Sequence, residues 1–337
     1  MPPSRAEGPV LVTGGTGYLG RRVIELLLEA GERVLALARR PAPELEALGA
    51  EARPGDLSDT ESLALAARGC AAVIHCAART GVWGPLSLYM EANVQGTRNM
   101  LSAARGAGAG IFIHASSPSA VYDGRDLAGV DESYEALPPR RFPYAWTKAL
   151  AEREVLAADS PELRTLALRP HLAWGPRDPH FLPRLAALAR AGRLRLFKGG
   201  PYLVDPTYVD NAARAHLLAL ARLREGAPCS GKAYFLGQGE AVDSRDFINS
   251  LLEAMGLPKA RISVPPRAGR LAARAAEAAW RLLRLKGEPP VSYFTALQLS
   301  TSHYFDISRA RDLLGYRPEV SMEEGLSRLK ASLAARA

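Results

Sequence analysis

The sequence predicts an α/β fold with a doubly wound parallel sheet, that is, a sheet with helices on both of its faces. Strand-like and helix-like stretches alternate through the first half of the 337-residue chain. Such alternation implies right-handed crossovers between parallel strands, which place the helices over the sheet. The chain also opens with an apolar run, a glycine-rich turn and a helical pattern, the unit with which nucleotide-binding folds of this class begin.

The segment from Val10 to Gly20 is typical of a strand, a tight turn and the start of a helix. Gly14, Gly17 and Gly20 are spaced three residues apart, and the helical pattern that follows stops at Gly31. Free N–H groups and the positive end of the helix dipole converge at such a turn, and glycine lets a ligand approach the backbone. The pattern therefore favours a pyrophosphate at the start of this helix.

The remaining elements are assigned from apolar runs bounded by turn residues. In the first half we expect strands at residues 9–13, 33–38, 71–76, 110–115 and 164–168, one more strand ending near residue 56, and helices at 17–30, 58–68, 85–106 and 144–158. In the second half we expect helices at residues 180–191, 206–224, 243–256, 267–286 and 321–335, and a short strand at 233–236.

These elements predict two parts of the molecule. Residues 8–175 are expected to form a Rossmann-type dinucleotide-binding domain, to which a segment near 205–237 returns. Residues 176–204 and 238–330 are expected to form a smaller, mostly helical cap that binds the substrate. Because parallel sheets bind ligands at the carboxyl ends of their strands, the site is expected there, under the cap.

Composition argues against several classes of protein. The chain is 47% hydrophobic and 23% charged, as in ordinary globular proteins, and no apolar run is long enough to span a membrane. Its net charge of +8 includes no basic block, so we expect no nucleic-acid partner. The three cysteines lack metal or disulfide spacing, and the six histidines form no ligand set, so we predict no metal site and a cytoplasmic location.

Tyr144 and Lys148 open the helix expected at residues 144–158. Four residues apart, they lie on one face, one turn from each other. An ammonium group beside a phenol favours the phenolate, so we expect Lys148 to lower the pKa of Tyr144. The tyrosine is then a proton donor or acceptor near neutral pH.

A serine cluster, Ser116, Ser117 and Ser119, follows the strand expected at residues 110–115. A serine hydroxyl at this strand end and the Tyr144 hydroxyl can together hold one carbonyl oxygen. With a dinucleotide bound at the same edge of the sheet, this arrangement predicts hydride transfer to or from a carbonyl carbon.

The strand expected at residues 33–38 ends in Arg39 and Arg40, with no acidic residue. An acid at this position would bond the ribose 2′-hydroxyl and select NAD, whereas a guanidinium suits a 2′-phosphate. We therefore expect a preference for NADP(H), with Arg39 the better candidate and Arg40 the second. NAD(H) stays the alternative, with both arginines as solvated loop residues.

These motifs resemble those of the extended short-chain dehydrogenase/reductases. Segments at residues 75–78, 93–97, 168–176, 207–211 and 305–318 extend the resemblance, and the later ones are similar to the 3β-hydroxysteroid dehydrogenase branch. The resemblance runs from about residue 8 to 330. It implies a catalytic set of Ser117, Tyr144 and Lys148, with Ser116 and Ser119 as alternatives for the serine.

The resemblance also implies which residues contact the cofactor, with Asp56 bonding the adenine amino group. Together with the two arginines, the expected contacts are Gly14, Thr16, Gly17, Tyr18, Leu19, Gly20, Arg39, Arg40, Asp56, Leu57, Ala77, Ala78, Tyr144, Lys148 and Pro170. Asn93 matches a position near the site, and it equally suits a structural role that fixes a helix to the sheet.

The substrate signal lies mainly in the loop Gly81-Val82-Trp83-Gly84, which resembles a loop of bacterial 2-alkyl-3-oxoalkanoate reductases and of bacterial sterol-dehydrogenase relatives. The resemblance implies reduction of a hydrophobic 3-oxo acid, or oxidation of a 3β-hydroxysteroid. A nucleotide-sugar epimerase and a non-catalytic dinucleotide sensor are further alternatives. The expected substrate contacts are Trp83, Ser119, His171, Trp174 and Tyr202.

Residues 267–286 predict a basic amphipathic helix. Four arginines recur at helical spacing, and the apolar residues define another face. We expect this apolar face to pack on the core, with contact to an anionic membrane or a pathway enzyme as the alternative. The resemblance further implies a homodimer formed through the helices expected at residues 85–106 and 144–158.

Overall fold

The main sheet consists of seven parallel strands in residues 8–260 and 262–335, the part of the chain that the computed structural model describes. The strands are β1 (Val10–Thr13), β2 (Val34–Ala38), β3 (Glu51–Pro54), β4 (Ala72–His75), β5 (Ile111–Ala115), β7 (Arg164–Pro170) and β10 (Lys232–Leu236). Their order in the sheet is β10-β7-β5-β4-β1-β2-β3. In register, Val10 of β1 faces Val34 of β2 and Ala72 of β4. The predicted fold class is confirmed.

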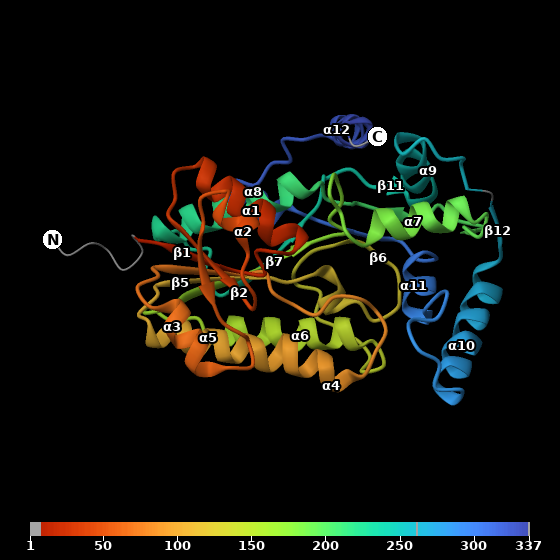
Figure 1. Cartoon of the computed structure of the whole chain (residues 1–337). Coiled ribbons are helices and arrows are strands. Elements are labelled where there is room, and N and C mark those ends of the chain that lie inside the picture. Colours follow the sequence, from red (N-terminus) through yellow and green to blue (C-terminus); the bar gives the residue numbers. More distant parts are fainter. Residues whose placement is uncertain (1–7, 261, 336–337) are drawn as a thin grey trace.

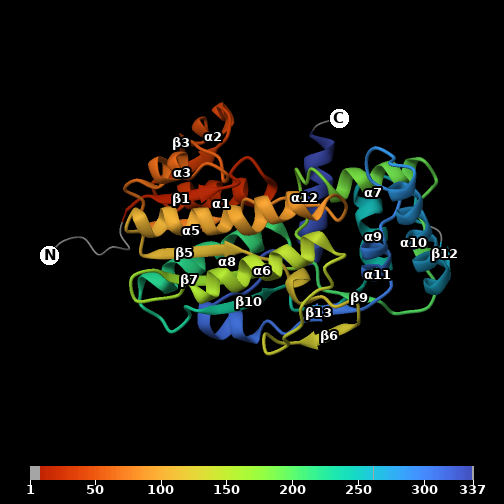
Figure 2. The same cartoon turned by 90° about the horizontal axis from the view of Figure 1, so that it is seen from below.

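Helices cover both faces of this sheet (Figure 1). One face carries α1 (Tyr18–Glu29), α2 (Pro43–Glu46) and α8 (Val209–Arg224). The other carries α3 (Thr60–Ala67), α5 (Gly96–Gly106) and α6 (Pro143–Ala157). A short helix α4 (Leu86–Tyr89) and a π-helical turn (Met90–Gln95) lead into α5. Helices α5 and α6 lie side by side, as Figure 2 shows.

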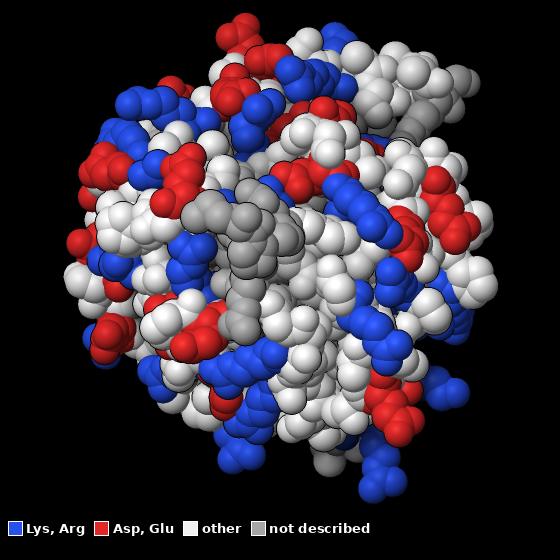
Figure 3. Space-filling model, turned by 90° about the vertical axis from the view of Figure 1, so that its left-hand side faces the viewer, with Lys and Arg blue, Asp and Glu red and all other residues white. Residues whose placement is uncertain are grey.

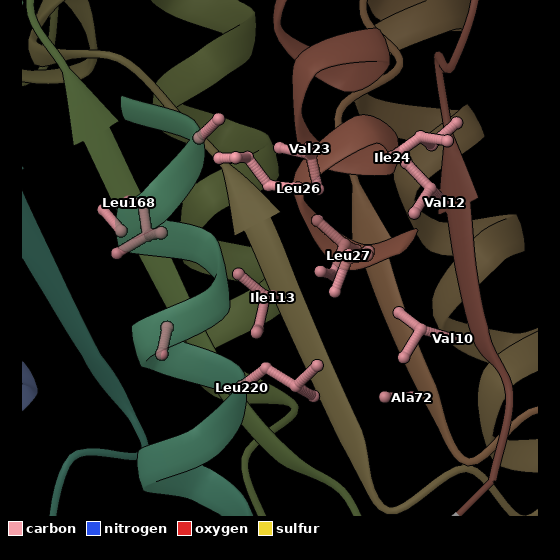
Figure 4. Packing of buried hydrophobic residues seen from close by; sticks show 14 of the residues in the cluster. Val10, Val12, Val23, Ile24, Leu26, Leu27, Ala72, Ile113, Leu168 and Leu220 are labelled. Carbon is pink, nitrogen blue, oxygen red and sulfur yellow. The ribbon is translucent and has the colours of Figure 1, made fainter. Parts of the chain in front are cut away.

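Alternating side chains of the strands supply two hydrophobic cores. Val10 and Val12 of β1 belong to the cluster under α1 and α8, where they lie near Ile24 and Leu27 (Figure 4). Leu11, between them, belongs to the cluster under α3 and α5. Because the sheet is covered on both faces, every residue of β1 is buried, as expected for a central parallel strand.

The cap lies beyond one end of the main sheet in both views (Figures 1 and 2). Its helices are α7 (Phe181–Arg190), α9 (Ser244–Ala254), α10 (Pro266–Leu282) and α11 (Tyr293–Gln298), and α12 (Met322–Ala334) packs near α9. Short strands join it: β6 (Leu127–Val130), β9 (Leu203–Val204), β11 (Val242–Asp243) and β13 (His303–Phe305) share one sheet, and β8 (Leu196–Phe197) pairs with β12 (Ile262–Val264).

Helix α10 departs from the expectation that its apolar face packs on the core. Leu271 and Leu282 are 68% and 83% exposed, and Ala273 is the residue that α10 buries. The inward side instead carries Arg270, which donates to the Ser300 side chain at 2.8 Å, and Arg274, which donates to the Tyr293 hydroxyl. The expectation was wrong because these arginine side chains find hydrogen-bond partners on the cap, and the leucines turn outward.

Charges of both signs are interspersed on the face shown in Figure 3, so the net charge of +8 is not gathered into one basic patch there. No helix in the described part of the chain combines the length and the apolar character needed to cross a bilayer.

Candidate active site

The glycine turn between β1 and α1 leaves no room for side chains. Gly14 has φ +71°, and a Cβ there would lie 2.7 Å from the backbone nitrogen of Ala77, while a Cβ at Gly20 would collide with the Gly14 carbonyl oxygen. Gly17 precedes α1 and provides no side-chain cap. The first N–H groups of α1 therefore face a bare turn, which fits a pyrophosphate. Thr16 and Gly17 are exposed at this turn.

A cavity of about 510 Å³ lies at the carboxyl ends of β2 and β3, lined by Arg39, Arg53 and Asp56. The Asp56 carboxylate accepts hydrogen bonds from the Ser58 N–H (2.9 Å) and hydroxyl (2.7 Å), which lower its pKa, and Arg39 lowers it further. Arg53 is paired with Glu51 at 2.6 Å. Among the described residues, Arg39 has no ion-pair partner, so its guanidinium is free to bind an anion in this cavity. Arg40 is exposed and does not line it.

A buried chain of hydrogen bonds fixes the backbone after β4. The Thr97 hydroxyl donates to the Asn93 carbonyl (2.7 Å) and so accepts from Nε2 of His75 (3.1 Å). Nδ1 of His75 then accepts from the Thr13 hydroxyl (2.8 Å), whose oxygen accepts the Ala77 N–H (3.1 Å). This chain is complete only for a neutral imidazole, and burial lowers the pKa of His75 to about 3.

Asn93 ties the same segment to α6. Its amide oxygen accepts the Arg79 N–H (2.6 Å), and its amide nitrogen donates to the Arg79 carbonyl (3.1 Å) and to the Thr147 hydroxyl (3.0 Å). Of the two roles that the sequence left open for Asn93, these bonds favour the structural one. Ala77, Ala78 and Leu57 lie half-buried along this edge of the sheet.

The three serines after β5 have different surroundings. The Ser116 hydroxyl is buried and donates to the Glu152 carboxylate at 2.6 Å. Ser117 is half-buried, its oxygen accepts the Ser119 N–H (3.2 Å), and its side chain is close enough to Tyr144 to lower the pKa of that phenol. Ser119 is buried. Ser117 is therefore the serine of the three whose side chain acts on the tyrosine.

Tyr144 and Lys148 lie on one face of α6, but the ammonium group is turned toward β5. Lys148 is buried, donates to the Ala115 carbonyl at 2.5 Å, and lies 3.4 Å from Nε2 of His114. Burial lowers the pKa of Lys148 to about 8, against an opposing effect of Glu152. Burial also raises the pKa of Tyr144, and Lys148 is not among the groups that shift it. The expected lowering of the tyrosine pKa by Lys148 is thus wrong for this arrangement.

Sequence analysis missed Glu152 and Arg169, which form a buried ion pair behind the site. Arg169 of β7 donates to both carboxylate oxygens of Glu152, at 2.9 and 2.5 Å, and the same carboxylate accepts the Ser116 hydroxyl. Glu152 follows Lys148 by four residues on α6 and raises its pKa. The spacing of four residues between Lys148 and Glu152 was the sequence signal from which Glu152 could have been found.

The expected substrate contacts divide between an open cavity and the protein core. Trp83 lines a cavity of about 280 Å³ with Phe142 and Phe294. Trp174 is fully buried and packs edge-on against Tyr208 and Phe247, a core position.

Tyr202 is half-buried and donates to the Lys198 carbonyl at 2.8 Å. Tyr18 and Leu19 are half-buried on α1, and Pro170 is buried at the end of β7.

His171 is paired with His303 rather than directed into a cavity. Nε2 of His171 lies 2.9 Å from Nδ1 of His303, and the outer nitrogens meet the carbonyls of Asp205 (2.9 Å) and Gln298 (2.8 Å). Burial lowers the pKa of both rings, that of His171 to about 3. Each of these three contacts needs one N–H proton. Two neutral rings carry only two such protons, so protonation of one ring would complete all three hydrogen bonds.

Comparison with known proteins places this arrangement in a family. Residues 11–266 match the model of the 3-beta hydroxysteroid dehydrogenase/isomerase family. The chain is 45% identical over 334 residues to a 2-alkyl-3-oxoalkanoate reductase of Stenotrophomonas maltophilia, covering 97% of this chain and 99% of that one. It is 42% identical to a protein of the same name from Shewanella oneidensis, covering 96% and 85%.

Solved structures agree with the fold. The crystal structure of gox2253 superposes with a TM-score of 0.76 at 28% identity, covering 98% of this chain and 99% of that one. MoeE5 in complex with UDP-glucuronic acid and NAD superposes with a TM-score of 0.73 at 26% identity, covering 98% and 100%. The chain therefore belongs to the 3-beta hydroxysteroid dehydrogenase/isomerase family, NAD(P)-dependent oxidoreductases among the extended short-chain dehydrogenase/reductases.

Proposed function

We propose that this protein is an NADP(H)-dependent ketoreductase that reduces a hydrophobic 2-alkyl-3-oxo acid to the 3-hydroxy acid. The observation that carries the proposal is the packing of α6, which begins beside Tyr144, against the turn that directly follows Ser117 at the end of β5, so that both residues lie at one edge of the sheet. A nicotinamide dinucleotide bound at this edge of the sheet supplies a hydride for a carbonyl carbon. The residues of the chain hold the carbonyl oxygen and deliver a proton to it.

Each residue of the catalytic set has a separate task. Tyr144 donates a proton to the oxygen as negative charge develops there, and its raised pKa keeps the phenol protonated before the reaction. Ser117 donates a second hydrogen bond to the same oxygen, since its own oxygen already accepts the Ser119 N–H. Lys148, held by the Ala115 carbonyl, would contact the nicotinamide ribose of a bound cofactor.

The remaining cofactor contacts follow from the cradle described above. Gly14, Gly17 and Gly20 make room for the pyrophosphate, and Arg39 and Asp56 line the cavity at the adenine end. Half-buried Ala77 and Ala78, which follow β4, lie on the other side of the glycine turn, toward β5 and the proposed catalytic set.

The substrate class rests on the two reductases at 45% and 42% identity and on the apolar cavity beside Trp83. A substrate panel tests it: NADPH oxidation with a long-chain 2-alkyl-3-oxo acid, a 3-ketosteroid and a UDP-sugar. We expect turnover of the oxo acid. Turnover of the steroid alone would leave the proposed mechanism unchanged but would make a steroid the substrate, as the matching family model favours. Turnover of the UDP-sugar alone would contradict the proposal.

Cofactor preference provides a sharp prediction. Arg39→Asp removes the free guanidinium of the 510 Å³ cavity and places an acid at the end of β2, so NADPH binding should weaken by roughly 10- to 100-fold. NADH binding should stay within a few-fold of the parent. Arg40→Asp is the matched control, since Arg40 does not line the cavity. If fluorescence titration gives Arg39→Asp and the parent the same affinity for NADPH, Arg39 does not bind the 2′-phosphate.

We also propose that α10 contacts an anionic membrane surface. Its outward face carries Leu271 and Leu282, and Leu285 follows just after its end; these leucines are 68%, 83% and 44% exposed, and Arg281 and Arg284 near them are also exposed. Exposed leucines between arginines suit the acyl–headgroup boundary. Leu282→Glu should abolish co-sedimentation with anionic vesicles at low salt; a parent protein that never sediments with them would refute the proposal.

A homodimer through α5 and α6 is proposed on the family resemblance and on the exposed outer side of these adjacent helices, where Arg98 and Glu154 form an ion pair. Light scattering should give twice the 36.2 kDa chain mass, and a monomer at micromolar concentration would contradict it.

A further inference from the structure

The cavity beside Trp83 combines an apolar wall with arginine side chains. It measures about 280 Å³, at the small end of the range for ligand pockets, and is lined by the loop after β4, the start of α6, α10 and α11. Its apolar wall comes from Val82, Trp83, Phe142 and Phe294. Pro143, which also lines it, directly precedes Tyr144. The cavity therefore reaches the first residue of α6, which is next in sequence to the proposed proton donor.

Two of its three charged side chains neutralise one another. Glu277 accepts the Tyr293 N–H at 2.7 Å and lies 3.7 Å from the Arg281 guanidinium. Arg281 also lies over the Trp83 ring, 5.1 Å from its centre. Because Glu277 already balances Arg281, this pair adds little net charge to the cavity.

The third charged side chain, Arg141, has no such partner. Within the described residues, no carboxylate oxygen lies within 4.0 Å of its guanidinium. The guanidinium lies 5.1 Å from the centre of the Phe142 ring and 5.7 Å from that of Tyr293. These two cation–π contacts hold the guanidinium near the rings and leave its N–H donors free. Arg141 is thus an exposed, unpaired cation that lines an apolar cavity.

We infer that Arg141 binds the carboxylate of the substrate, with the alkyl part of the molecule against Trp83, Phe142 and Phe294. This inference rests on the proposed function and adds the residue that distinguishes an oxo acid from a neutral ketone. A guanidinium binds a carboxylate through two parallel hydrogen bonds, which fixes the acid end and so orients the chain that carries the carbonyl.

The test compares an acid with its neutral ester in the direction of alcohol oxidation, where both compounds are stable. A 2-alkyl-3-hydroxy acid and its methyl ester are oxidised with NADP⁺ by the parent, Arg141→Gln and the control Arg140→Gln, an adjacent exposed arginine that does not line the cavity. We expect Arg141→Gln to lower kcat/KM for the acid by roughly tenfold, with the ester unaffected, because one charge-assisted contact is lost. Calorimetry should show the same rise in Kd for the acid, and Arg140→Gln should change neither value.

Two results would overturn the inference. One is an equal loss for acid and ester in Arg141→Gln, which would reflect general damage to the cavity. The other is a selective loss of the acid in Arg281→Gln with none in Arg141→Gln, which would move the carboxylate to Arg281. A parent that oxidises neither compound would instead contradict the proposed function, and the calorimetric Kd would still decide the role of Arg141.

Discussion

Tyr144→Phe is expected to lower kcat by about 10²- to 10⁴-fold while leaving the affinity for NADPH nearly unchanged. The change removes one hydroxyl, the group that meets Ser117 and is proposed to protonate the substrate oxygen. The aromatic ring, and with it the packing of the first turn of α6, is retained. Stopped-flow turnover and fluorescence titration of NADPH measure the two quantities separately.

The serine cluster supplies matched controls for this result. Ser117→Ala should lower kcat because its hydroxyl faces Tyr144, whereas Ser116→Ala should mainly lower stability because its hydroxyl donates to Glu152. If Tyr144→Phe keeps more than a tenth of the parent kcat, another group must provide the proton. If Ser116→Ala loses turnover and Ser117→Ala does not, the serine has been assigned to the wrong position.

Acid is expected to lower the free energy of unfolding by about 3 kcal/mol between pH 7.5 and 5.5. Burial lowers the pKa of His75 to about 3 and of His216 to about 4, and burial with the Lys148 charge lowers that of His114 well below 6.5. These rings stay neutral when folded and take up protons when unfolded, so their stabilisation is present above pH 6.5 and is lost as pH falls. Each contributes about 1.4 kcal/mol over this range.

Two buried carboxyls work in the opposite direction. Burial raises the pKa of Asp205 to about 6, so the folded state binds its proton first and gains about 0.8 kcal/mol by pH 5.5. Burial also raises the pKa of Glu132, which acts in the same direction. We assign the pair of His171 and His303 no net contribution to this pH dependence. Burial disfavours an added proton on the pair, but the same proton would complete its hydrogen bonds. Urea unfolding at each pH measures the sum.

His216→Gln changes one histidine on α8, a residue outside the proposed catalytic set. Its imidazole is buried and bonded to the Ala212 carbonyl at 2.8 Å. The variant should be less stable at pH 7.5, yet its loss of stability with acid should be smaller than that of the parent by about 1.4 kcal/mol. The same dependence on pH in both proteins would show that this ring does not remain neutral in the fold.

Local patterns were sufficient for the frame of the fold. The strands of the main sheet and the long helices follow from apolar runs and turn residues, and the bounds expected for α1 and α6 differ from the observed ones by one residue at each end. The spacing of the glycines located the turn at Gly14. Glycine suits this position because φ is positive there and the Ala77 backbone approaches closely. The short strands β6 and β13, which lie outside the main sheet, carry no periodic signal and were missed.

Tertiary contacts decided what the sequence left open at the site. Nothing in the spacing of Ser116 and Ser117 shows which hydroxyl would be taken by Glu152, a residue 36 positions from Ser116. The direction of the Lys148 ammonium depends on the Ala115 carbonyl of a neighbouring strand, and spacing along one helix does not contain that information. The outward leucines of α10 were misjudged for the same reason, since amphipathic spacing does not say which face meets the core.

The central claim is that this chain catalyses hydride transfer to the C3 carbonyl of a long-chain 2-alkyl-3-oxo acid. It is tested most directly with NADPH deuterated at both C4 positions of the nicotinamide ring, followed by mass spectrometry of the product. The account predicts a 3-hydroxy acid that carries one deuterium at C3, formed by the parent and at least about 100-fold more slowly by Tyr144→Phe. Recovery of the oxo acid unchanged, or of a hydroxy acid without deuterium at C3, would contradict it.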